Sequence, residues 1–235
     1  GFDAVTTLLT QCRKPMGPRL SSFEVMWRDF FDISTGLLKK GRPGLNLAGS
    51  HVVLVEAMGM DPEQDDALFA QTLGSFQTDH SGCEVILAQS LTDAQDLWSI
   101  REAAGEAALV VAPWAGFDVS LPLAHMAAWA DEVRARLRGM GLTQTQTYGH
   151  LGDGNLHLVV GLGPEPTRKA EVHELVHRTV GELGGSISGE HGIGLAKKAH
   201  LHYCRSAAEI NMMKLMKTSL DPHGILNRGR IFDLP

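Results

Sequence analysis

A short histidine-containing segment of the sequence could bind a metal ion. Residues 148–158 read YGHLGDGNLHL and place His150 and His157 on either side of a Gly-Asp-Gly-Asn run. On one straight strand, two side chains seven residues apart would point to opposite faces. We therefore expect a tight turn at residues 152–155 to bring the two imidazoles together.

A second segment could complete this site. Residues 186–194 read SISGEHGIG and place Glu190 and His191 between glycines. Two neutral imidazoles and one carboxylate leave a position open for water or substrate, as in catalytic zinc sites. We predict that His150, His157 and Glu190 bind a divalent metal, with zinc favoured over manganese or iron, which accept the same ligands.

Other candidate residues have simpler interpretations. Asp153 lies inside a Gly-Asp-Gly turn, which suits backbone hydrogen bonding or support of a histidine at least as well as metal binding. His173 and His177 have the i, i+4 spacing of a helical zinc site but lack the glutamate of HExxH, so we interpret them as surface residues. For Lys197 and Lys198, a solvated helix face is favoured over neutralisation of charge at the site.

Composition argues against several functional classes. The 235 residues include 21 lysines and arginines and 27 acidic residues, giving a net charge of -6 without a basic run, so a nucleic-acid partner is not expected. Cys12, Cys83 and Cys204 form no CxxC pair, which argues against a disulfide framework and favours a reducing cytoplasm.

No segment of the sequence is expected to cross a membrane. The longest apolar stretch, residues 107–117, is interrupted by proline and glycine and is shorter than the ~20 residues that span a bilayer. The first residues lack the pattern of a secretory signal, and they are typical of the middle of a longer protein.

Strand and helix patterns alternate along the chain. We expect strands at residues 20–26, 52–57, 83–88 and 117–121 and another approaching Tyr148, and helices at 27–38, 61–76, 92–110, 123–140 and 166–183. This order predicts an α+β fold, a ferredoxin-like αβ-sandwich with a largely antiparallel sheet, helices on one face and additional C-terminal helices. Residues 51–88 and 117–162 are expected to form two similar halves.

Three sequence strings resemble a known family. GHLGDGNLH and GEHGIG, followed by LDPHGILN near the end, resemble the C-terminal domain of FAD-linked oxidases, a family that includes D-lactate dehydrogenases, D-2-hydroxyglutarate dehydrogenases and glycolate oxidase subunits. The resemblance runs from the SSFEVM segment to the loop at Asn227. It implies that residues 1–235 are a substrate- and metal-binding domain and that the N-terminal FAD-binding domain is absent from the chain, which contains no GxGxxG or Walker motif.

The resemblance also implies roles for individual residues. His150, His157 and Glu190 would bind the metal, and His191 would act as the base that takes the proton of a D-2-hydroxy acid. The hydrogen on the same carbon would leave as hydride to FAD. Arg101 is expected to bind the substrate carboxylate. Asn227 is expected at the flavin, although this chain has Asn-Arg-Gly-Arg where the family usually has Asn-Pro-Gly-Lys.

The substrate side chain is expected to be small. Gly105, Gly116 and Val159 stand where relatives that bind a dicarboxylate have polar residues. A second carboxylate would lack partners, which favours a D-lactate-like substrate over D-2-hydroxyglutarate.

Two other functions stay open on the sequence alone. The same His, His, Glu set could serve a free-standing metal-dependent hydrolase or non-haem iron enzyme, which would act without flavin. A non-catalytic metal-binding or interaction domain is the third alternative, although it would leave His191 beside Glu190 unexplained. The fragment is expected to be inactive by itself; the electron acceptor is left open, and a homodimer is compatible with the sequence.

Overall fold

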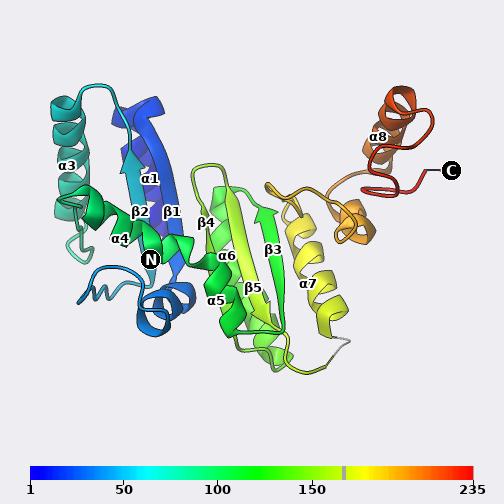
Figure 1. Ribbon diagram of the computed structural model, residues 1–235, viewed down its shortest axis with the longest axis horizontal. Helices are drawn as coiled ribbons and strands as arrows, with labels where there is room; N and C mark the ends of the chain where they lie inside the picture. The colour runs from blue at the N-terminus through cyan, green and yellow to red at the C-terminus, as the bar shows by residue number, and fades with distance from the viewer. Residues whose placement is uncertain (166–167, 235) are drawn as a thin grey trace.

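An antiparallel sheet of five strands organises the fold (Figure 1). The computed structural model describes residues 1–165 and 168–234, and its strands lie in the order β2-β1-β4-β5-β3. Every ladder is antiparallel, as predicted. The strands are β1 (Leu20–Trp27), β2 (His51–Ala57), β3 (Trp114–Ser120), β4 (Thr145–His150) and β5 (Asn155–Gly161).

Helices surround the sheet and extend beyond it. The α-helices are α1 (Phe2–Met16), α2 (Arg28–Asp32), α3 (Pro62–Asp79), α4 (Leu91–Glu102), α5 (Ala104–Val110), α6 (Leu123–Gly139), α7 (Arg168–Glu182) and α8 (Ala207–Leu220). Short 3-10 turns form η1 (Gly17–Arg19) and η3 (Lys198–Tyr203), and η2 (Ile33–Leu37) is a π-helix. Within the described ranges, none of these helices has both the length and the apolar character needed to span a lipid bilayer.

The two faces of the sheet bury different sets of side chains, because side chains alternate along each strand. The larger core includes Phe23 and Val25 of β1 and packs against α1, α3, α6 and α7. The smaller core includes Met26, Tyr148 and Val159 and packs against α2, α4 and α5. The long helices thus cover one face, and the shorter helices cover part of the other, where the polar residues described below also lie.

The expected α+β sandwich is confirmed, but the strand predicted at residues 83–88 is wrong. The structure assigns this segment to no ladder. Cys83, Val85 and Leu87 instead pack as partly buried side chains against the larger core, so packing accounts for their apolar alternation without strand pairing. Residues 51–88 therefore contain only one strand, β2, so the expectation of two similar halves is wrong; β1 lies between β2 and β4 and joins them into one sheet.

Several helix predictions also need correction. The helix expected at residues 92–110 is divided at Ala103 into α4 and α5, and the one at 27–38 is a short α-helix followed by a π-helix. The helix expected at 166–183 is described from Arg168 onward, and its first two predicted residues lie outside the described ranges. The sequence analysis did not identify α1, which buries Leu9 and Cys12 in the larger core.

Candidate metal and substrate site

The β4–β5 hairpin brings His150 and His157 together, as expected from the turn between them. Tyr148 pairs with His157 across the ladder, and His150 lies two residues further along β4 on the same face. Gly154 has φ +80 in the turn, a conformation that other residues rarely adopt. The centroids of the two imidazole rings are 5.4 Å apart.

Glu190 approaches both histidines from the loop that follows α7. Its Oε1 lies 3.2 Å from His157 Nε2 and 3.9 Å from His150 Nε2. One potential ligand atom from each of the three residues lies within 4.8 Å of the others. The structure therefore brings together the three residues that the sequence selected, although they come from two strands and a distant loop.

A buried glutamate that the sequence analysis missed orients His150. Glu24 of β1 is paired with His150 in the ladder and accepts a 2.8 Å hydrogen bond from its Nδ1. This bond raises the pKa of His150 against the effect of burial. Burial by itself would raise the pKa of Glu24, but the hydrogen bond from His150 and the charge of Arg101 outweigh it and lower that pKa. In the neutral ring with Nδ1–H directed to Glu24, the lone pair is on Nε2, which lies 3.3 Å from Arg101 Nη2 and 3.9 Å from Glu190 Oε1.

His157 is available as a neutral ligand. Its side chain is buried, and burial, followed by the nearby Arg101 charge, lowers its pKa to about 4. The imidazole is therefore uncharged at neutral pH, which is the form that binds metals.

Asp118 of β3 holds the loop that carries Glu190, and it was also missed. It lies opposite His157 in the ladder. Its carboxylate accepts backbone N–H hydrogen bonds from Gly189 at 3.1 Å, Glu190 at 3.1 Å and His191 at 2.8 Å. A Cβ at Gly189 would lie 2.7 Å from Asp118 Oδ1, so this approach requires glycine.

Lys197 completes the anchor at Asp118. Its Nζ lies 3.2 Å from Asp118 Oδ2, and both side chains are largely buried. Burial would raise the pKa of Asp118, but the His191 N–H hydrogen bond and the Lys197 charge hold it well below its usual range. The interpretation of Lys197 as part of a solvated helix face is therefore wrong, whereas Lys198 pairs at the surface with Asp233.

His191 lies at the exposed edge of the cluster. Its Nδ1 is 3.7 Å from Asp118 Oδ2, and its Nε2 is 3.5 Å from Glu190 Oε1. The ring stacks on His157 with centroids 5.7 Å apart, and 64% of the side chain is exposed. A substrate could thus reach His191 on the side where the predicted ligands lie.

Arg101 reaches the same site from α4. Its Nε donates to Glu24 Oε2 at 2.8 Å, its Nη2 lies 3.3 Å from His150 Nε2, and its guanidinium lies over the Tyr148 ring. Arg101 is buried rather than exposed on the helix surface, because only 8% of the residue is accessible to solvent. An open pocket of about 550 Å³ is bordered by both Arg101 and His150.

The structure places the remaining candidates away from the cluster or in other roles. Asp153 accepts a 3.2 Å hydrogen bond from the Asn155 N–H, in agreement with its interpretation as a turn residue. Asn227 is exposed at φ +45 and makes no side-chain hydrogen bond within the described parts of the chain. Its loop is nevertheless connected to the Glu190 loop, because Ile231 N–H donates to the Gly194 carbonyl at 2.8 Å.

Comparisons with known proteins agree with this architecture. The chain is 33% identical over 226 residues to a protein from Oryza sativa subsp. japonica named probable D-2-hydroxyglutarate dehydrogenase, mitochondrial, covering 95% of this chain and 40% of the relative. It is 38% identical over 158 residues to a D-2-hydroxyglutarate dehydrogenase of Stutzerimonas stutzeri, covering 63% of this chain and 33% of the relative. The chain thus spans less than half of the length of these relatives.

The fold also resembles that of a solved structure. The 4-ethylphenol oxidase from Gulosibacter chungangensis, in its isoeugenol complex, matches with a TM-score of 0.63 and 16% sequence identity, over 100% of this chain and 52% of that one. The model of the family described as FAD linked oxidases, C-terminal domain, matches residues 1–231. The chain therefore belongs to the family of the FAD linked oxidases, C-terminal domain.

Proposed function

We propose that this chain is the substrate- and metal-binding part of an FAD-dependent dehydrogenase that oxidises D-2-hydroxy acids. The observation that carries the proposal is the convergence of His150, His157 and Glu190 beside His191. The family supports a flavin-linked oxidation, and the relatives named above are 2-hydroxy acid dehydrogenases. The flavin would be held mainly by the part of such relatives that has no counterpart in this chain, with the Asn227 loop facing it.

The residues of the cluster fit a divalent metal, preferably zinc. Two imidazoles and a carboxylate form an open ligand set, and Glu24 orients His150 as carboxylates commonly do in metal sites. When bound there, such an ion lowers the pKa of a substrate hydroxyl.

His191 takes the hydroxyl proton in this proposal. Its Nε2 is on the side of the metal ligands, whereas Nδ1 is directed toward Asp118. The ionised Asp118 stabilises the imidazolium that forms. The flavin of the complete enzyme supplies the two-electron acceptor for the hydrogen on the adjacent carbon.

Arg101 binds the substrate carboxylate. The guanidinium lies 3.3 Å from His150 Nε2, next to the proposed ligands. This planar group can donate two parallel hydrogen bonds to a carboxylate.

We further propose a substrate with one carboxylate and a short side chain, such as D-lactate. Val159 lies on β5 two residues from His157, on the same face, and presents an apolar surface to the smaller core. A Cβ at Gly105 would meet no neighbour within 4 Å, so this position offers space but no hydrogen-bonding group. A D-2-hydroxyglutarate dehydrogenase needs partners for a second carboxylate, and these positions supply none.

Metal analysis tests the centre of the proposal. Both His150→Ala and Glu190→Ala should contain about one equivalent less zinc or manganese than the purified wild-type chain. Asp153→Asn is the matched control. This carboxylate lies in the same hairpin but outside the proposed ligand set, so the substitution should leave the metal content unchanged. A folded wild type that takes up no added metal at these residues would contradict the proposal.

Activity of the full-length protein tests the base. His191→Gln should lower kcat with D-lactate by about 10²–10⁴-fold and leave the metal content unchanged, since general-base catalysis contributes rate enhancements of this size. Full activity in this variant would remove His191 from the mechanism. A higher kcat/KM for D-2-hydroxyglutarate than for D-lactate in the wild type would contradict the proposed substrate but not the proposed role of His191.

A further inference from the structure

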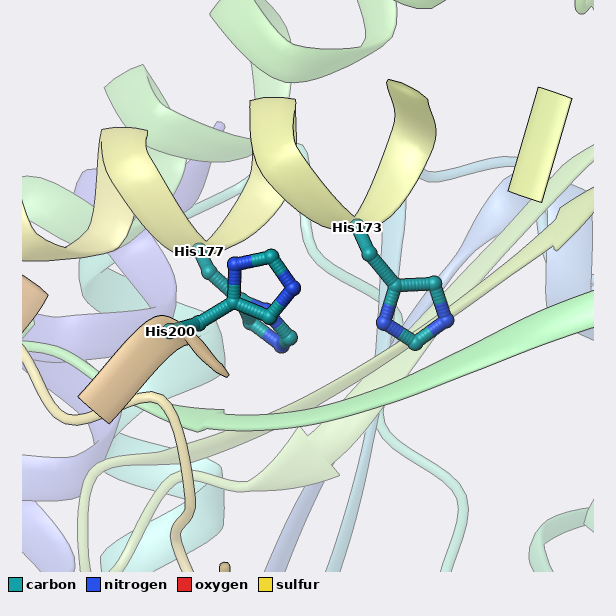
Figure 2. A group of neighbouring side chains, drawn as sticks. All are labelled: His173, His177 and His200. Atoms are coloured by element: carbon teal, nitrogen blue, oxygen red, sulfur yellow. The ribbon is translucent and has the colours of Figure 1, made fainter. Parts of the chain in front are cut away.

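Three other histidines meet between α7 and η3 (Figure 2). His173 and His177 project from the same side of α7, and His200 approaches them from η3. Ring centroids are 5.4 Å apart for His173 and His177 and 4.6 Å for His177 and His200. One ring nitrogen of each lies within 4.8 Å of the others. The interpretation of the first two as surface residues is wrong, because His177 is only 1% exposed and His173 is partly buried.

The polar atoms of this cluster lack partners in the protein. Both ring nitrogens of His177 and Nε2 of His173 are buried without a hydrogen bond to any described residue. A buried polar atom left unpaired is unfavourable, because it loses its hydrogen bonds to water on folding. Contact with Phe117, whose ring lies 4.9 Å from His173 and 5.5 Å from His177, explains the packing of the rings. It does not explain why ring nitrogens of His173 and His177 are buried without a partner in a cluster where one nitrogen of each of the three histidines lies within 4.8 Å of the others.

Burial disfavours the charged form of all three imidazoles. Burial, followed by the nearby imidazole and lysine charges, lowers the pKa of His177 to about 3, and burial lowers the pKa of His173 to about 4. Burial also lowers the pKa of His200. A neutral imidazole has a lone pair on one ring nitrogen, and this is the form of histidine that binds metals.

We propose that His173, His177 and His200 bind a divalent transition metal, with zinc as the best fit, in a second site that joins η3 to α7. Nitrogens about 2.0–2.1 Å from one tetrahedral ion are about 3.4 Å from each other, so small side-chain rotations would close the present cluster around it. Glu174 Oε2 lies 3.5 Å from His200 Nδ1 and can orient this ring, as carboxylates do for metal-bound histidines.

The proposed ion would have a structural role. η3 lies between α7 and α8 in the chain, and Leu201 is its buried residue. Few side chains of η3 therefore fix it to the rest of the protein. Lys197, the residue before η3, is the cation that pairs with Asp118 below the Glu190 loop. Fixing η3 against α7 would therefore also hold Lys197 in place. No substrate or flavin is involved in this site.

Cobalt binding tests the site independently of the proposed catalytic cluster. The test uses the chain with His150→Ala and Glu190→Ala, purified without a polyhistidine tag and treated with a chelator. We expect about one equivalent of Co²⁺ to bind with the visible absorption of a nitrogen-coordinated ion, and Zn²⁺ to displace it. Zn²⁺ at about 100 times its Kd should raise Tm by roughly 5–10 °C.

Variants of the cluster identify the ligands. Adding His177→Phe, which keeps an aromatic ring against Phe117, should abolish Co²⁺ binding and the rise in Tm. His173→Gln provides the same test at a less buried position, should the phenylalanine variant fail to fold. His202→Ala is the matched control, because His202 is an exposed histidine of η3 outside the cluster.

Two results would overturn the proposal. One is a folded parent variant, shown by circular dichroism, that binds no Co²⁺ or Zn²⁺. The other is Co²⁺ absorption that persists in both His177→Phe and His173→Gln. Because the parent variant already lacks two predicted catalytic ligands, neither result depends on the proposed dehydrogenase function.

Discussion

At the scale of single residues, the candidate site depends on carboxylates that do not themselves belong to the predicted ligand set. Glu24 fixes the orientation of His150, and Asp118 gathers the backbone N–H groups of the loop that carries Glu190 and His191. Each carboxylate is buried and each is paired with a cation, Arg101 or Lys197. A buried charge is tolerated only with such partners, so these pairs restrict the geometry of the site.

Asp118→Asn should destabilise the protein. Removing one charge leaves Lys197 unpaired and weakens the loop hydrogen bonds, and broken buried ion pairs typically cost about 3–5 kcal/mol. Because the folded state holds the pKa of Asp118 well below its usual range, its stabilisation is present above the unfolded pKa and is lost as pH falls toward the folded pKa.

Urea unfolding of both proteins between pH 7 and pH 3 measures this effect. The difference in the free energy of unfolding should be constant above about pH 5 and should narrow below about pH 4, by up to ~1.4 kcal/mol per pH unit. A difference that does not change with pH would show that Asp118 is not ionised in the folded protein.

Gly189→Ala should disturb the loop through steric overlap. The new Cβ would lie 2.6 Å from Asn155 Oδ1 and 2.7 Å from Asp118 Oδ1. We expect a loss of about 1–3 kcal/mol in stability and weaker metal binding by Glu190. Gly82→Ala is the control, because a Cβ there meets no atom within 4 Å and should change stability by less than about 0.5 kcal/mol. Equal effects in the two variants would contradict the packing argument.

At the scale of elements, local turn residues determine the hairpin, whereas tertiary packing determines the position of the first helix. The β4–β5 hairpin follows from local turn chemistry at residues 151–154, and so its two histidines could be paired from sequence. Helix α1 is fixed by burial of its apolar face against the sheet and α3. The spacing of Leu8, Leu9 and Cys12 is helical, but only the tertiary structure identifies the surface that it covers.

The thiol of Cys12 should be unreactive in the folded protein. Burial raises its pKa to about 11, so at pH 8 only about one thiol in a thousand would be ionised. We expect a thiol-reactive reagent to label Cys83 and Cys204 faster than Cys12, because these two side chains are only partly buried. Cys12 should be labelled only after unfolding in urea. Rapid modification of the Cys83→Ser/Cys204→Ser variant in buffer would contradict the burial of α1.

At the scale of the whole molecule, the polar candidate site and an exposed apolar stripe lie on different elements. The candidate site lies on the sheet face that carries the smaller core, whereas α8 stands apart from the sheet beyond α7 (Figure 1). None of the residues of α8 is buried. Four exposed side chains form an apolar stripe at helical spacing, namely Met212, Leu215, Met216 and Leu220.

Introducing charge into this stripe should weaken the contact of α8 with the flavin-binding part proposed for the complete protein. The relatives are more than twice as long as the matched region, and we expect their additional portion to cover α8 in the complete protein. In the full-length protein, Leu215→Glu with Leu220→Lys should reduce FAD retention on gel filtration. Thr218→Glu, exposed on the same helix outside the stripe, should retain FAD. Full retention by the double variant would show that α8 does not contact the flavin-binding part.

The sequence by itself determined the parts of this protein that depend on neighbouring residues. It identified the α+β class, most of the strands, the hairpin, and the two segments that carry the predicted metal ligands and base. The elements and candidate ligands follow from local periodicity, turn chemistry and the spacing of ligand types, all of which are encoded within a few residues. The role of His191 as the base is implied only by the family resemblance.

Only the tertiary structure decided which distant residues meet. The ladder order places Glu24 and Asp118 next to the two hairpin histidines, and the packing of η3 against α7 adds His200 to a pair that appeared solvent-exposed in sequence. Packing also replaced the strand expected at residues 83–88 with an unpaired segment against the core. Contacts between residues far apart in the chain depend on strand order and helix docking, which no local pattern specifies.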